Sequence, residues 1–222
     1  MPDYFSCVAT ALQSAKQPLS VDDLVRITEP HLPASGEKPY AMVYRALEKL
    51  FQAVPIVEGK YGWLSTVLQD NWIRHPLTTE EVEKGFLLMD ELEHAAFFPQ
   101  FFQTHRNDGR TLQIDLLGGP SIQAQAYIER KTWSLKLGQE FVDWVEQIGG
   151  QGRDDLLILV NDAVSGHYTL RLQPREARVD AEIQERNIGL ALMAEELVRQ
   201  NRNGWDVMPT WELAARLVAG GH

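Results

Sequence analysis

The sequence is poor in cysteine and in long apolar runs. Cys7 is the only cysteine among 222 residues, so an internal disulfide framework and a structural zinc site built on several thiolates are excluded. No apolar run is longer than Leu156 to Val160, which is far shorter than the roughly 20 residues that cross a bilayer. The first residues also lack a basic segment followed by an apolar stretch, which argues against a secretory signal. We therefore expect a cytoplasmic protein that does not partner a membrane.

Positive charge is also scarce. The chain has 21 basic and 31 acidic residues, a net charge of −10. This balance argues against a protein that coats nucleic acid without specificity, because such binding depends on neutralising phosphates. The deficit is uneven, since residues 1–67 hold six basic and seven acidic residues. The N-terminal third is therefore the part least repelled by a phosphate backbone.

The usual motifs of enzymes and metal proteins are absent. None of the six histidines lies at the i, i+4 spacing of a zinc-binding helix. The sequence has no Gly-x-Ser-x-Gly elbow, phosphate loop or dinucleotide fingerprint. Cys7 is interpreted as a small buried residue of the first helix in preference to a nucleophile. We accordingly expect no enzymatic activity, no metal and no cofactor.

One set of residues tests that expectation. Asp115 is followed fourteen residues later by Glu129 and then by Lys131. A carboxylate followed by Glu-x-Lys on the next strand is the minimal pattern of one nuclease superfamily, in which two carboxylates hold a divalent metal. The helix which that fold requires does not follow the strand before Glu129. We therefore interpret these residues as solvent-facing charges at strand ends.

Residues 1–67 predict three helices followed by a hairpin. Phe5, Val8, Ala9 and Leu12 recur at helical spacing, and Val21, Leu24, Val25 and Ile27 are expected to point inward from a second helix. Ser20 is a good N-cap for that second helix. A third helix starts near Pro39, a residue favoured in the first turn. Two short β runs around Gly59 and Gly62 then predict a hairpin.

This order resembles the HARE-type winged helix-turn-helix, which occurs in restriction endonucleases, in chromatin proteins and, in similar form, in the delta subunit of bacterial RNA polymerase. The matching residues are Pro18-Leu19, Gly36-Glu-Lys-Pro39 and the hairpin Val57 to Leu64. The resemblance covers about residues 1–66. It implies that the third helix and the hairpin, or wing, contact nucleic acid. The candidate contact residues are Lys38, Tyr40, Tyr44, Arg45, Lys49, Lys60 and Tyr61.

The remainder of the chain is interpreted as a connector and a β-rich domain. Residues 68–110 predict a connector with a short acidic helix capped by Thr78 or Thr79. From residue 111 the apolar residues alternate, which predicts three strands, one short helix and a hairpin. The layout of residues 111–173 is similar to the DNA-binding pseudobarrel of plant transcription factors and some restriction enzymes. Residues 177–218 predict a terminal helical hairpin.

These observations lead to an α+β protein with an N-terminal winged helix-turn-helix (1–67), a connector (68–110) and a C-terminal small open barrel or sheet (111–222). The leading hypothesis is a non-enzymatic protein that binds double-stranded DNA or acts in transcription. The alternatives are an adaptor for a protein partner, such as an RNA polymerase, and a DNA nuclease or restriction specificity subunit. The sequence leaves the oligomeric state open.

Overall fold

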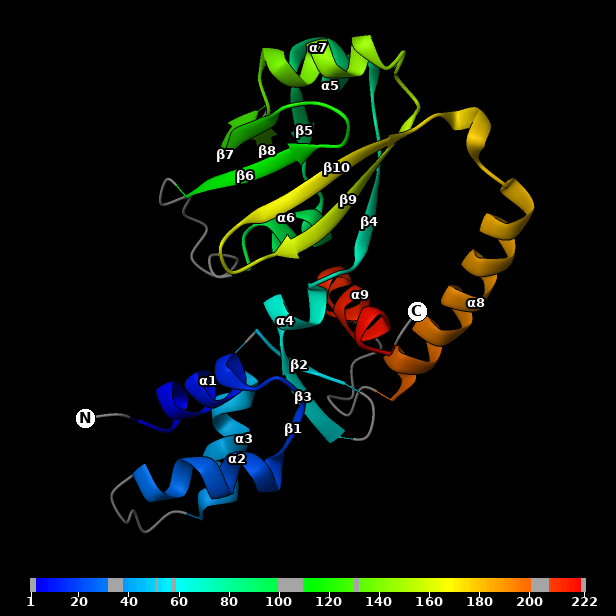
Figure 1. Ribbon diagram of the computed structural model, residues 1–222. Coiled ribbons are helices and arrows are strands. Elements are labelled where there is room, and N and C mark those ends of the chain that lie inside the picture. The colour runs from blue at the N-terminus through cyan, green and yellow to red at the C-terminus, as the bar shows by residue number, and fades with distance from the viewer. Residues whose placement is uncertain are drawn as a thin grey trace. The chain divides into compact units, whose positions relative to one another are not determined.

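The computed structural model describes residues 3–31, 38–50, 52–56, 59–99, 110–129, 132–200 and 208–220. The chain is a mixture of helices and strands, an α+β fold (Figure 1). It divides into two units. Unit 1 comprises residues 1–68 and 212–222, and unit 2 comprises residues 69–211.

Unit 1 contains small helices and a three-stranded antiparallel sheet with the order β1-β3-β2. Its elements are α1 (Tyr4–Ser14), β1 (Leu19–Ser20), α2 (Val21–Thr28), the 3-10 helix η1 (Glu29–His31), α3 (Pro39–Lys49), β2 (Ala53–Pro55), β3 (Lys60–Trp63), α4 (Leu64–Leu68) and, from Glu212 on, α9 (Thr210–Ala219). The expected order of three helices and a hairpin is therefore present, with one added strand between the first two helices.

The helix starts in unit 1 follow the local sequence signals. Ser20 caps α2 as expected, and its side chain exchanges hydrogen bonds with Asp23 in a capping box. Pro39 occupies the first turn of α3, where its missing N–H costs no helical hydrogen bond. Local sequence signals therefore predict correctly where both helices begin.

The core of unit 1 is formed by apolar residues of α1, α2 and α3. Val8, Leu24 and Val43 are completely buried, and ten buried residues form one cluster. Two expected core residues are exposed, Phe5 by 42% and Ile27 by 43%, and Ala9 and Val21 are only partly buried. The helical spacing was correct, but it does not reveal how far a neighbouring helix extends over each turn.

Unit 2 is built on a seven-stranded sheet. Its elements are β4 (Trp72–Pro76), α5 (Thr79–Lys84), β5 (Phe86–Leu88), α6 (Glu91–Phe97), β6 (Thr111–Leu116), β7 (Ser121–Glu129), β8 (Thr132–Lys136), α7 (Gln139–Gln147), β9 (Asp155–Asp162), β10 (His167–Gln173), the 3-10 helix η3 (Arg175–Ala177) and α8 (Asp180–Arg199). The strand order is β4-β9-β10-β6-β7-β8-β5. β10 and β6 run parallel, and the other neighbours run antiparallel.

The alternation of apolar residues in β6 and β7 determines which face of the sheet is buried. Leu112, Ile114 and Ile122 are at most 3% exposed, while their neighbours in the strands are exposed or half-buried. Ile128 breaks the pattern, because it lies near the end of β7 and is 63% exposed. The predicted strands are therefore confirmed, but the inward position that the alternation predicts for Ile128 is wrong.

The boundaries of the two units differ from those expected from the sequence. Residues 68–110, expected as a connector, contribute β4 and β5 to the two ends of the strand order. Phe97 and Phe98 follow in α6 and at its end, and both are buried. The last helix, expected to belong to the C-terminal domain (111–222), belongs to unit 1 from Glu212 onward. The expected boundary at Thr104–Arg110 falls mostly outside the described residues.

A buried histidine joins three segments of unit 2. His75 lies in β4, and its Nε2 is 2.9 Å from Oε1 of Glu81 while its Nδ1 is 2.6 Å from Oε1 of Glu93. Burial by itself lowers the pKa of His75, but the hydrogen bonds to the two carboxylates raise it to about 10. Both ring nitrogens therefore donate at neutral pH, and the network ties β4 to α5 and α6.

The 20-residue helix α8 differs from the other long elements in its exposure to solvent. None of its residues is buried, and Ile188 and Leu192 are 58% and 64% exposed. Among the described residues, no helix is both long and apolar enough to cross a membrane.

Candidate nucleic-acid interface

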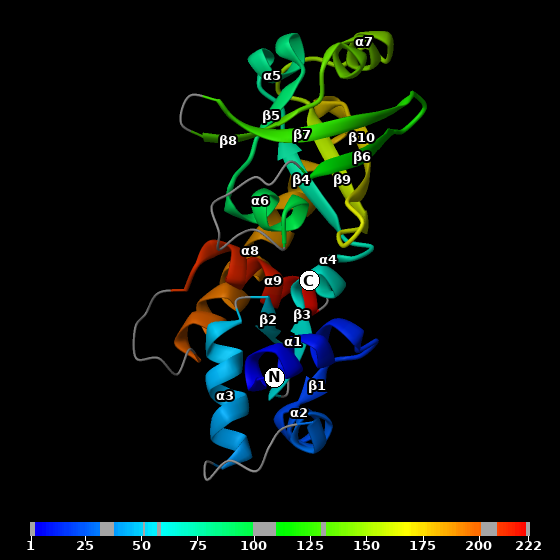
Figure 2. The ribbon, with the colours of Figure 1, turned by 90° about the vertical axis from the view of Figure 1, so that its left-hand side faces the viewer.

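The exposed side of α3 carries most of the residues expected to contact nucleic acid. Val43, Ala46 and Leu47 face the core, which turns Tyr44, Arg45 and the rest of the opposite side outward. α3 forms one side of unit 1 (Figure 2). The exposed residues of the candidate set on and before this helix are Lys38, Tyr40, Tyr44, Arg45 and Lys49.

The charges on α3 are predominantly positive. Arg45 and Lys49 are four residues apart, so their side chains stand one turn apart on the same side of the helix. Lys38 is the N-cap residue, and its side chain makes no capping hydrogen bond. Glu48 is the one described carboxylate on this exposed side. With its side chains a helix is about 10–12 Å across, which matches the width of about 12 Å of a DNA major groove.

The two exposed tyrosines of α3 differ in their surroundings. Tyr40 is 50% exposed, and its hydroxyl donates a hydrogen bond of 2.9 Å to Oδ1 of Asp22. This hydrogen bond also raises the pKa of the Tyr40 hydroxyl. Tyr44 is 49% exposed. Tyr40 therefore links α3 to the start of α2.

The two candidates in the hairpin differ in their exposure and in their neighbours. Lys60 is exposed, but it pairs in register with Ser20 of β1 and lies near Asp23, whose pKa it helps to lower after the dominant hydrogen bonds from Ser20. Tyr61 is half-buried and packs against the core cluster. Tyr61 therefore stabilises the sheet. The hairpin residues at positions 57 and 58 lie outside the described part of the chain.

Sequence reasoning missed a cation on α2. Arg26 has a side chain that is 77% exposed, and one of its nitrogens is 3.6 Å from Oδ1 of Asp23. Asp22 and Asp23 occupy the first turn of the same helix, where carboxylates stabilise the positive end. The surface beside α3 thus carries both signs of charge. The signal was present in the sequence, because Arg26 falls opposite the buried residues of α2.

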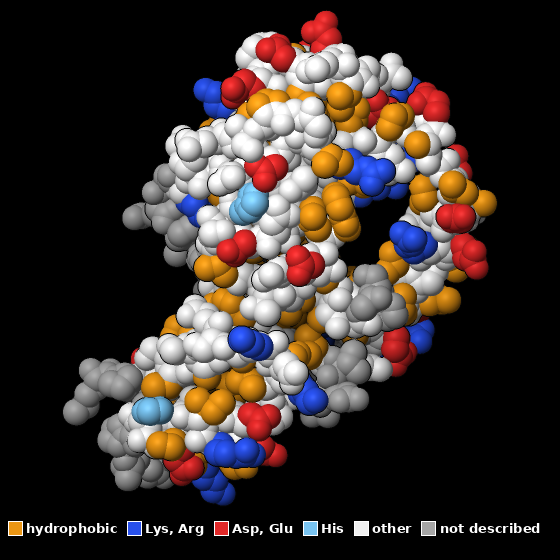
Figure 3. All heavy atoms as spheres, viewed as in Figure 1, with side chains coloured by type: hydrophobic (Ala, Val, Ile, Leu, Met, Phe, Trp, Pro, Cys, Tyr) orange, Lys and Arg blue, Asp and Glu red, His pale blue; other side chains and the backbone are white. Residues whose placement is uncertain are grey.

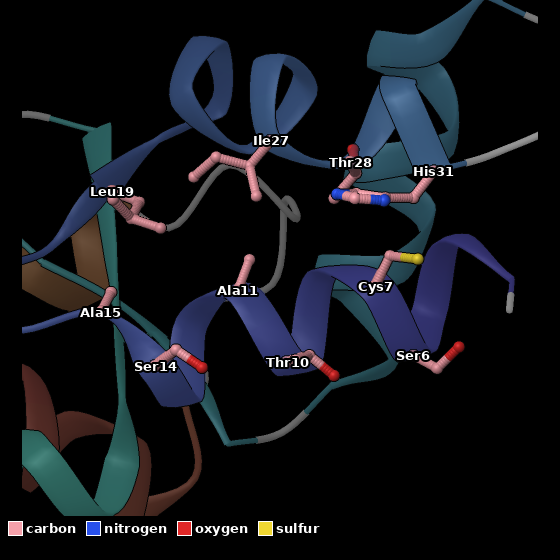
Figure 4. A pocket seen from close by; sticks show the side chains of 10 residues that line it. All are labelled: Ser6, Cys7, Thr10, Ala11, Ser14, Ala15, Leu19, Ile27, Thr28 and His31. Atoms are coloured by element: carbon pink, nitrogen blue, oxygen red, sulfur yellow. The ribbon is translucent and has the colours of Figure 1, made fainter.

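An apolar groove runs between α1 and α2 in unit 1 (Figure 4). It has a volume of about 660 Å³ and is lined in part by Ala11, Leu19 and Ile27, which explains why Ile27 is exposed. Cys7 was expected to be buried in the core, but it is half-buried and lies in the wall of this groove. The adjacent Thr28 hydroxyl is satisfied by the carbonyl oxygen of Leu24.

Asp115 in unit 2 is engaged by neighbouring side chains. Its Oδ2 is 2.6 Å from Nε2 of His167, and its Oδ1 accepts a hydrogen bond from the Ser121 hydroxyl. The Ser121 and His167 hydrogen bonds lower the pKa of Asp115. The side chain of Glu129 and all of Lys131, the other two members of the nuclease-like pattern, lie outside the described residues. In the described part of the chain, no three His, Cys, Asp or Glu residues are grouped so as to hold a metal ion.

Comparison with known proteins finds solved structures that align with about half of this chain. No protein-family model matches it, and no curated protein matches it. The Arabidopsis FUS3–DNA complex is 15% identical and aligns over 46% of this chain and 94% of its own, with a TM-score of 0.34. The Arabidopsis thaliana LEC2–DNA complex is 16% identical over 48% and 97%, with a TM-score of 0.34. The N-terminal domain of Helicobacter pylori LlaJI.R1 is 12% identical over 53% and 89%, with a TM-score of 0.38.

Proposed function

We propose that unit 1 is a winged helix-turn-helix domain that binds duplex DNA through the exposed side of α3. The observation that supports this best is the pair Arg45 and Lys49, one turn apart on a helix whose opposite side is fully packed. The order α2, α3 and the β2–β3 hairpin is the order of elements in that domain type. A packed helix with an open cationic side can enter the major groove without unfolding.

The proposed binding is moderate in strength and sensitive to salt. Few cations contribute, and Glu48 with the acidic start of α2 opposes them. Each phosphate neutralised adds about 0.9 to the slope of log affinity against log salt. Lys38, Arg45 and Lys49 together therefore predict a slope of about 3. The function proposed is binding without catalysis.

The test is a salt titration of the full chain against random-sequence duplex DNA. Arg45→Ala and Lys49→Ala should each weaken binding at every sequence and reduce the salt slope by about one. Glu48→Gln should tighten binding, because it removes the carboxylate beside both cations. Arg186→Ala, an exposed position of α8, is the matched control and should change nothing. Binding that is absent at low salt, or that survives both alanine substitutions together, would refute the proposal.

Catalysis is tested separately with the same protein. Incubation with duplex DNA and Mg²⁺ or Mn²⁺ should leave the DNA intact. Metal-dependent cleavage that disappears in Glu129→Gln would show that the chain is a nuclease, and the proposal of binding alone would then be wrong.

A further inference from the structure

The outer face of β4, β9 and β10 in unit 2 combines arginines with an exposed tryptophan. Strand register places two rows of side chains next to each other on this face. The first row is Trp72, Leu159 and Thr169, and the second is Arg74, Leu157 and Arg171. Their strand neighbours on the other face, including Ile73, Ile158 and Leu170, are buried.

Trp72 gives this face an aromatic surface. Its side chain is 51% exposed, in an edge strand, beside the half-buried Leu159. Figure 3 shows hydrophobic and basic side chains gathered together over β4, β9 and β10. An indole ring next to cations on a sheet face is the arrangement in which proteins stack unpaired bases.

Two carboxylates beside this face are buried and already bound, whereas Asp115, in register with Thr169, is half-buried and Asp70, just before β4, is exposed. Asp155 is 1% exposed and lies 2.9 Å from Nε of Arg74, and it also binds Arg178. Asp154 is 2% exposed and accepts hydrogen bonds from the backbone N–H groups of Gln151 and Arg175. Arg171 of this face is exposed, and so are two further arginines near the strand ends, Arg153 and Arg175; the described residues give no ion pair for these three.

The spacing suits a nucleotide chain. Arg74 and Arg171 are separated by two strand spacings, which is about 10 Å. Trp72 and Arg74 are two residues apart on one strand, which is about 7 Å. A base stacked on Trp72 can therefore have a neighbouring phosphate at Arg74 and a further phosphate at Arg171.

Duplex DNA fits this face less well than a single strand does. Bases in a duplex are already stacked on one another and are read by an element that enters a groove, such as a helix or a two-stranded ribbon. Trp72 stands on a sheet face and offers its ring to a base that must be unstacked. We propose that this face binds single-stranded DNA, with Trp72 stacking a base and Arg74 and Arg171 holding phosphates. The choice of DNA over RNA rests on the proposed function of unit 1, but the stacking site itself does not.

The test measures binding of a labelled oligo-dT strand to the full chain by fluorescence anisotropy. Trp72→Ala should weaken binding about tenfold, while Trp72→Phe should retain most of it. Arg171→Gln should weaken binding and lower the salt slope by about 0.7, the value for one contact to a single strand. Arg171 is the cleaner position for this test, since Arg74 also holds the buried Asp155.

Controls separate this proposal from the duplex-binding function of unit 1. The double variant Arg45→Ala/Lys49→Ala should bind oligo-dT as wild type does, so failure of the α3 proposal leaves this result unchanged. Equal oligo-dT binding by wild type and Trp72→Ala, or no binding at low salt, would overturn the proposal. So would duplex binding that depends on Trp72 and Arg171 as strongly as oligo-dT binding does. Tighter binding of oligo-rU than of oligo-dT would overturn the assignment to DNA.

Discussion

Replacing His75 should destabilise unit 2 far more than an ordinary surface substitution. Glu81 and Glu93 are 1% and 4% exposed, and His75 supplies the positive charge between them. Glu81 keeps hydrogen bonds from Thr78 and from the backbone N–H of Leu88. His75→Leu removes the cation and leaves two buried carboxylates uncompensated. Breaking a buried ion pair in this way costs about 3–5 kcal/mol of unfolding free energy.

The pH dependence gives a second measure of the same interaction. The pKa of His75 rises from 6.5 to about 10 on folding, so the folded protein binds one more proton between these values. The stabilisation is therefore fully present below about pH 6.5 and is lost as the pH rises toward about 10. Each pH unit in this window costs about 1.4 kcal/mol, which gives a loss of about 3 kcal/mol between pH 7 and pH 9.

Urea unfolding of the full chain, followed by circular dichroism at several pH values, measures both quantities. His75→Gln is the key comparison, because its amide still donates a hydrogen bond but does not titrate. Its unfolding free energy should lack the steep fall that wild type shows above neutral pH. His167→Gln, a half-buried histidine of the same unit, is the matched control. A cost below about 1 kcal/mol for His75→Leu, or identical pH profiles for wild type and His75→Gln, would refute this account of the network.

Three further substitutions test the packing, each by urea unfolding. Gly85→Ala should cost about 2 kcal/mol or more, because Gly85 has a φ of 68° and an added Cβ would collide with the carbonyl oxygen of Gly138; an unchanged midpoint would contradict this. Tyr168→Phe should cost about 1–2 kcal/mol, since the buried hydroxyl donates to the carbonyl oxygen of Ala96, and a neutral result would mean that this bond contributes nothing. Leu24→Ala should cost about 2–5 kcal/mol and act on unit 1, so an effect confined to unit 2 would argue against the division of the chain.

Local signals in the sequence identified most of the individual elements. Ser20, Thr78 and Pro39 mark helix starts in the structure, because capping and proline geometry depend on only a few adjacent residues. The alternation in β6 and β7 was equally informative, since a sheet with one buried face imposes a period of two. The side of α3 that is exposed follows from the same reasoning.

The long-range pairings could not be obtained in this way. β4 and β5 are short and lie in a stretch that also contains helices, so their partners β9 and β8 give no local sign of the match. The His75 network joins residues up to 18 positions apart through three elements. Trp72 falls in the stretch expected as a connector, and its place on the same sheet face as Arg171 depends on pairing through β9. Tyr61 was expected to contact nucleic acid from the hairpin, although in the structure it packs against the core of unit 1.

Because residues 212–222 belong with residues 1–68, unit 2 is an insertion within unit 1. Translation proceeds from the N-terminus, so all of unit 2 is synthesised before the last segment of unit 1 leaves the ribosome. α9 carries Ala215, which is completely buried, and its Val218 lies against residues of α1 and β3 around a small cavity. Unit 2 can thus fold on the nascent chain before unit 1 has acquired α9. Unit 1, which carries the surface proposed to contact duplex DNA, would then be completed after unit 2.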